Sequence, residues 1–165
     1  MTEPCRALRG LLEAVVREYR RILGRNLAGI YLHGSAAFGC FRWQTSDIDL
    51  LVAVHAPPSS RQKEGLVRTL LAQGAAAPPA GFEMSVVLVR YCRQFVWPVP
   101  YELHFSNMHR ASFEKDLSAA CAHMHGTDKD LAAHFAVTRA AGVTLWGENP
   151  RTMFCAIPPG AYKAA

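Results

Sequence analysis

Two carboxylates, Asp47 and Asp49, open an apolar run that continues from Leu50 to Val54. Residues two apart on an extended strand point to the same face, with their Cα atoms roughly 6.5–7 Å apart. Two carboxylates at that spacing could share a divalent cation, and Mg²⁺ typically takes one or two carboxylates together with phosphate oxygens. The pair therefore predicts a magnesium site at the start of a buried strand.

A glycine-serine turn, Gly34-Ser35, follows the apolar run of residues 27–33, which we expect to form a second buried strand. Backbone N–H groups in such a turn, together with the serine hydroxyl, can bind a phosphate. We expect a helix over residues 36–41 whose N-terminus lies at Ser35, which would add partial positive charge there. Ser46, next to the carboxylate pair, could also reach a phosphate oxygen. These features together indicate a site for a nucleoside triphosphate and its metal.

A third carboxylate, Glu83, lies near the beginning of residues 82–90, a segment that is apolar on both faces and is therefore expected to be a central strand. A lone carboxylate that opens a buried strand is costly unless it is paired or bound to a metal. A solvated strand end is the alternative interpretation. Because Asp47 and Asp49 already indicate a metal, we predict that Glu83 joins them.

The rest of the chain must position these residues. Apolar residues three and four apart predict helices over residues 4–24, 60–73, 111–120 and 128–141, with Thr127 as the N-cap of the last helix. Further strands are expected over residues 101–105 and 143–147. These elements indicate an α/β (α+β) protein. We assign residues 1–150 to one domain and residues 151–165 to an irregular, unanchored C-terminal tail.

Composition narrows the class of protein further. The chain of 165 residues has a net charge of +5, which suits anionic partners such as nucleotides, but its arginines are scattered, so we do not expect it to bind nucleic acid. Its five cysteines are odd in number, contain no CxxC and follow no signal peptide, which predicts reduced thiols in the cytoplasm. No apolar run approaches the roughly 20 residues of a membrane span. Residues 121–125 contain Cys and His but too few ligands for zinc.

The spacing of the site motifs resembles a known signature. Gly34-Ser35, eleven further residues and then Asp47-x-Asp49 resemble the nucleotidyltransferase superfamily, whose fold is that of DNA polymerase beta. Three later segments are similar to aminoglycoside adenylyltransferases of the streptomycin/spectinomycin type: residues 101–106, 128–135 and 142–147. The resemblance covers nearly the whole chain, and it implies a nucleotidyltransferase fold with a mixed central sheet flanked by helices.

The resemblance also implies an activity, in which AMP is transferred from ATP to a hydroxyl of a small molecule, such as an aminoglycoside, and pyrophosphate is released. Asp47, Asp49 and Glu83 would hold two Mg²⁺ ions, with Glu83 as general base, and Gly34, Ser35 and Ser46 would bind the nucleotide. The family's C-terminal helical domain has no counterpart after residue 147, so a homodimer or a partner chain could complete the site. A protein hydroxyl, as in toxin–antitoxin pairs, is an alternative acceptor. A nucleotide-binding module without turnover is the other alternative.

Overall fold

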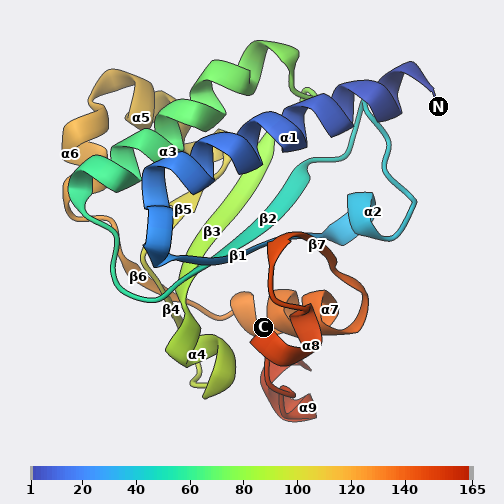
Figure 1. Ribbon diagram of the computed structural model, residues 1–165, viewed down its shortest axis with the longest axis vertical. Helices are drawn as coiled ribbons and strands as arrows, with labels where there is room; N and C mark the ends of the chain where they lie inside the picture. The colour runs from blue at the N-terminus through green and yellow to red at the C-terminus, as the bar shows by residue number, and fades with distance from the viewer. Residues whose placement is uncertain (1, 164–165) are drawn as a thin grey trace.

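A five-stranded mixed sheet lies at the centre of the computed structural model, which describes residues 2–163 (Figure 1). The strand order is β5-β3-β2-β1-β7. β2 and β3 are parallel, whereas every other neighbouring pair in this sheet is antiparallel. The strands span Leu27–His33 (β1), Ile48–Val54 (β2), Phe82–Leu88 (β3), Leu103–Phe105 (β5) and Val143–Gly147 (β7).

Helices cover both faces of this sheet (Figure 1). One layer contains α1 (Glu3–Leu23) and α3 (Ser60–Gln73), with α5 (Arg110–Lys115) and α6 (Leu117–Ala122) beside them. The opposite layer contains α4 (Val89–Arg93), α7 (Leu131–Ala141), α8 (Pro150–Met153) and α9 (Pro159–Lys163). β4 (Val99–Tyr101) and β6 (Gly126–Asp128) form a second, two-stranded sheet. Among the described residues, no helix is long and apolar enough to span a bilayer.

The alternation of side chains along β2 divides the core into two layers. Ile48 and Leu50 pack among buried residues of α1 and α3. Leu51 and Ala53 pack on the other face, among buried residues of α7 and the segment that follows it. Because residues two apart share a face, Asp49 must lie on the α7 side of the sheet. The predicted α/β class and mixed sheet are therefore confirmed.

Short elements differ from the sequence predictions. The expected strand over residues 101–105 is divided between two sheets at Glu102, whose N–H donates to the carbonyl of Val86 (2.8 Å). The expected helix over residues 111–120 is interrupted at Asp116, whose carboxylate accepts a hydrogen bond from the N–H of Ala119 (3.1 Å) and so starts α6. The helix expected over residues 36–41 is the single turn α2 (Gly34–Ala37).

Two predictions near the C-terminus were wrong. Thr127 is not a helix cap, because it lies in β6; α7 begins at Leu131, after a turn in which the Asp128 carboxylate accepts from the N–H of Asp130 (2.8 Å). The expected tail of residues 151–165 is not irregular where the structure describes it, since α9 and most of α8 lie within it and Phe154 is fully buried. Residues 164 and 165 of the expected tail lie outside the described residues.

Candidate active site

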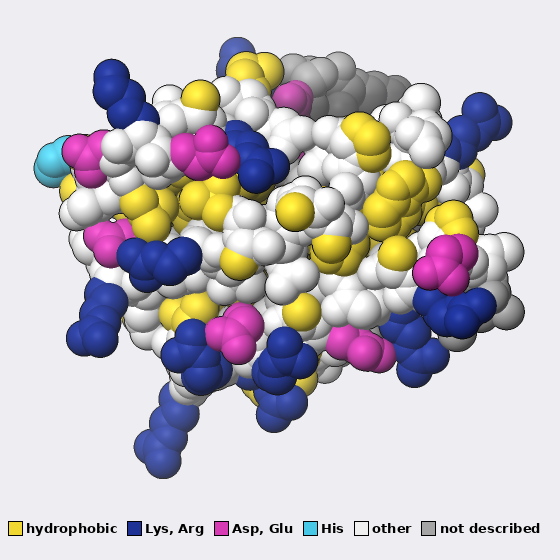
Figure 2. Space-filling view, turned by 90° about the horizontal axis from the view of Figure 1, so that it is seen from above, with side chains coloured by type: hydrophobic (Ala, Val, Ile, Leu, Met, Phe, Trp, Pro, Cys, Tyr) yellow, Lys and Arg dark blue, Asp and Glu magenta, His cyan; other side chains and the backbone are white. Residues whose placement is uncertain are grey.

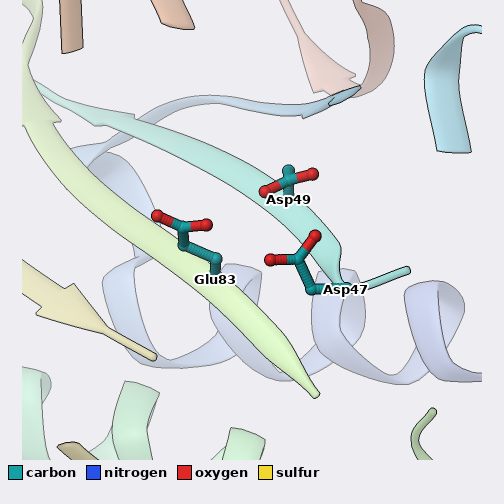
Figure 3. Close-up of side chains that lie close together, drawn as sticks. All are labelled: Asp47, Asp49 and Glu83. Carbon is teal, nitrogen blue, oxygen red and sulfur yellow. The ribbon is translucent and has the colours of Figure 1, made fainter. Parts of the chain in front are cut away.

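Asp47, Asp49 and Glu83 converge on one face of the sheet (Figure 3). Asp49 and Glu83 are register partners in the parallel β2–β3 pair, and Asp47 directly precedes β2. Each of the three offers a carboxylate oxygen, and these oxygens lie within 4.8 Å of one another. The sequence prediction that Glu83 joins the aspartates therefore agrees with the geometry.

Burial and mutual repulsion perturb these carboxylates. Burial raises the pKa of Asp49 to about 8, and the negative charges of Asp47 and Glu83 add to this shift. Burial also raises the pKa of Glu83, although the nearby His134 acts in the opposite direction. Carboxylates at this separation resist simultaneous ionisation unless a cation lies between them. A donor set of carboxylate oxygens alone suits a hard divalent ion such as Mg²⁺, so these residues fit the metal that the sequence implied.

The Gly34-Ser35 turn lies directly against Asp49. His33 is the register partner of Asp49, so the chain leaves β1 beside this carboxylate. Gly34 has a φ of +68°, and a Cβ at this position would collide with Oδ2 of Asp49. Glycine adopts this backbone conformation without strain, and any larger residue here would force the Asp49 carboxylate to move. Helix α2 begins at this turn. The N–H groups of its first turn have no intrahelical partners.

Ser46 lies at the end of the loop that precedes Asp47 and Asp49. Its Oγ accepts a hydrogen bond from the N–H of Arg42 (2.9 Å), and its own N–H donates to the carbonyl of Arg42 (2.8 Å). The hydroxyl hydrogen can still donate to a phosphate. The structure thus gives Ser46 a role in positioning Asp47, while the expected contact with nucleotide stays a prediction.

Histidines surround the carboxylates on the same face. The rings of His33 and His134 lie 5.0 Å apart between centroids, which joins the end of β1 to α7. Burial lowers the pKa of His33 to about 3, and His134 lowers it further. His104 of β5 shares a hydrogen bond with the Oγ of Ser85 (2.9 Å), two residues beyond Glu83 on β3. Burial also lowers the pKa of His104, and the neighbouring His109 lowers it further. The imidazole of His33 is therefore neutral near pH 7.

Sequence reasoning did not identify His134 or Ser85 as neighbours of the site. The available signals were that Ser85 shares a strand face with Glu83 and that His134 lies within the segment similar to adenylyltransferases. The cysteine and histidines of residues 121–125 belong to no comparable cluster: among residues 2–163, the group of three potential ligands brought together is the acidic triad.

Comparison with known proteins identifies the fold. No family model matches the chain. The structure of the spectinomycin adenyltransferase AAD(9) from Enterococcus faecialis, with ATP and spectinomycin, superimposes with a TM-score of 0.82 over 94% of this chain, at 18% identity. A toxin–antitoxin structure with AMP-PNP matches 86% of this chain and 79% of its own, at 17% identity and a TM-score of 0.43.

The likeness to the spectinomycin adenyltransferase confirms the predicted nucleotidyltransferase fold. The chain spans 62% of the length of that protein.

Proposed function

We propose that this protein is a magnesium-dependent nucleotidyltransferase that transfers AMP from ATP to a hydroxyl of a small-molecule acceptor of the aminoglycoside type. The observation that carries the proposal is the convergence of Asp47, Asp49 and Glu83 beside the Gly34-Ser35 turn. In this arrangement the three carboxylates would bind a cation, and the N–H groups at the adjacent turn would bind phosphate. The likeness in fold to an adenyltransferase that binds ATP and spectinomycin supports it.

In this reaction Asp47, Asp49 and Glu83 would hold Mg²⁺, and bound divalent ions supply charge neutralisation on the phosphates during in-line displacement. The turn at Gly34 and Ser35, with the hydroxyl of Ser46, would orient the triphosphate. The acceptor oxygen forms a bond to the α-phosphorus as the bond to pyrophosphate breaks. Glu83 takes the proton of the acceptor hydroxyl, a role that suits a carboxylate whose pKa burial has raised.

We further propose that the folded domain, α8 and α9 included, is the lobe that binds metal and nucleotide. Part of the acceptor site would then come from another domain or a partner chain, a second copy of this chain included. Consumption of ATP suits a cytoplasmic location. The net charge of +5 favours a second candidate acceptor, a protein hydroxyl, because a cationic antibiotic prefers an acidic pocket.

The test is a transfer assay with ATP labelled at the α-phosphate, Mg²⁺ and a mixture of streptomycin and spectinomycin. We expect label on the drug, and we expect Asp49→Asn and Glu83→Gln each to lower the rate by at least about 10³-fold. Glu114→Gln, an exposed substitution on α5, is the matched control and should keep the wild-type rate.

Two results would contradict parts of the proposal. Label on protein but not on drug would replace the antibiotic with a protein acceptor. Saturable, Mg²⁺-dependent binding of ATP without transfer to any acceptor would identify a nucleotide-binding module without turnover.

A further inference from the structure

Helix α1 has a broad apolar face, and only part of this face is fully buried in the core. Its buried row contains Leu11, Val15 and Tyr19, each at most 4% exposed, and packs on the sheet and α3. A second row, Leu8, Leu12 and Val16, repeats every four residues and is only partly buried. A surface helix normally has one apolar stripe opposite a polar face. The second row packs against the margin of the core and leaves part of its apolar surface exposed to solvent.

This second row lines a long groove between α1 and the edge strand β7. The groove has a volume of about 910 Å³ and follows α1 from Cys5 to Gly24, roughly 28 Å at the helical rise. Leu145 and Trp146 of β7 complete its apolar lining. It is larger than the other cavity described, which measures about 100 Å³ near Gly74 and is separate from the acidic triad.

The rim of the groove is basic. Four arginines line it, with one glutamate, Glu13, which forms an ion pair with Arg9 (3.0 Å). Glu18 of the same helix lies 2.8 Å from Arg21 and 3.9 Å from Arg17, so two carboxylates face four guanidinium groups. The guanidinium of Arg20 lies 5.3 Å from the centroid of the Trp146 ring, so its charge is held over the apolar lining. Figure 2 shows the molecule from above the view of Figure 1, with hydrophobic side chains exposed on this face and Arg and Lys side chains projecting at its margin, Asp and Glu side chains among them. The groove thus combines an apolar floor with excess positive charge.

We propose that the groove between α1 and β7 binds an amphipathic α-helix of a partner protein, with an apolar stripe on the groove floor and Asp or Glu side chains facing the arginines. The lining residues recur at three- and four-residue intervals over five turns of α1, which is how one helix packs along another. A partner that bound as an additional β-strand would pair with the edge strand β7 instead of α1. Only two of the residues that line the groove belong to β7.

Charge decides between an acidic partner and a second copy of this chain. Two copies that met through this groove would bring their arginine rims together, and each chain already carries a net charge of +5. Like charges brought together at an interface are costly, whereas acidic residues would pair with Arg17 and Arg20. An acidic helix is therefore the occupant that the groove favours.

The probe is a designed, fluorescein-labelled 18-residue helical peptide with leucines at i, i+4, i+7 and i+11 and glutamates flanking them, about 27 Å long. We expect saturable anisotropy, with at least tenfold weaker binding to the double variant Arg17→Glu/Arg20→Glu. Arg6→Glu, on the same helix but outside the groove, should bind the peptide as the wild type does. A peptide with lysines in place of the glutamates should bind at least tenfold more weakly. Circular dichroism verifies that the variants are folded.

Chemical shifts of N–H groups locate the peptide-binding site on the protein. We expect changes at the second row of α1 and at the indole N–H of Trp146. Equal affinity for the acidic and basic peptides, no saturation at about 1 mM peptide, or shifts confined to other elements would each overturn the proposal. A concentration-dependent dimer that Arg17→Glu/Arg20→Glu abolishes would also overturn it, because the occupant would then be a second copy.

Discussion

Asp49 and Glu83 occupy the same level of the parallel β2–β3 pair, so their side chains lie next to each other on the α7 face of the sheet. Neighbouring strands are roughly 4.8 Å apart, a distance at which two half-buried carboxylates repel each other unless one is protonated or a cation intervenes. Asp47 adds a third negative charge at the start of β2. This crowding of charge gives the site measurable consequences for stability and for metal binding.

The stability of the metal-free protein should depend on pH through Asp49. Its pKa is about 8 in the folded state, against 3.8 ordinarily, so between these values the unfolded state loses the proton first. The contribution of Asp49 to stability therefore declines as the pH rises from about 4 to about 8. Asp49→Asn cannot ionise, and in EDTA it should melt about 2–4 °C above wild type at pH 8, after allowance for solvent screening. At pH 4 the melting temperatures should coincide, and a constant difference across this range would contradict the assignment.

Magnesium should stabilise the folded protein near pH 7.5, because a cation relieves repulsion among the three carboxylates. At Mg²⁺ about ten times its Kd, binding to the folded state alone contributes about 1.4 kcal/mol. We expect a rise in melting temperature of about 3–5 °C, reversed by EDTA. Glu83→Gln should lose most of this rise, whereas Glu114→Gln should keep it. Equal Mg²⁺ responses in both variants would place the metal elsewhere.

Gly34 and Gly39 provide a matched pair that tests the contact between the turn and Asp49. Both have positive φ, +68° and +75°, but a Cβ at Gly39 would meet no atom within 4 Å. Gly39→Ala should therefore cost only the conformational strain, roughly 1–2 kcal/mol. Gly34→Ala adds a collision with Asp49, so it should cost more and should also weaken Mn²⁺ binding at least tenfold, measured by electron paramagnetic resonance. Equal Mn²⁺ affinities in the two variants would show that Gly34 does not support the metal site.

The long elements and the acidic triad could be predicted from the sequence. Strands β1 and β7 and helix α3 begin and end at the predicted residues, because clear turn or capping residues bound each of them in the sequence. The triad was predictable because each carboxylate opens a strand, and adjacent parallel strands bring their first residues together. This argument requires that the two strands be adjacent and parallel, and β2 and β3 are such a pair.

Contacts between distant short segments could not be predicted in this way. His134 lies beside the site because α7 crosses the sheet face, an arrangement that no local pattern encodes. Helix α7 also begins later than its composition suggested, because the turn at Asp128 and Asp130 competes with the helix for backbone N–H groups. The segment after residue 148 contains prolines, yet it is ordered by tertiary contacts of its few apolar side chains.

Phe154 tests whether that last segment belongs to the folded core. Its fully buried ring lies 5.3 Å from the ring of Tyr31 on β1 and 4.9 Å from that of Phe135 on α7, between centroids. Truncation of a buried phenylalanine removes these contacts and leaves a cavity, so Phe154→Ala should cost about 3–5 kcal/mol in urea denaturation. Arg151→Ala, exposed on α8, should change stability by less than about 0.5 kcal/mol. If both variants unfolded at the wild-type urea concentration, the segment would not contribute to the core, and residues 151–165 would behave as the unanchored tail that the sequence suggested.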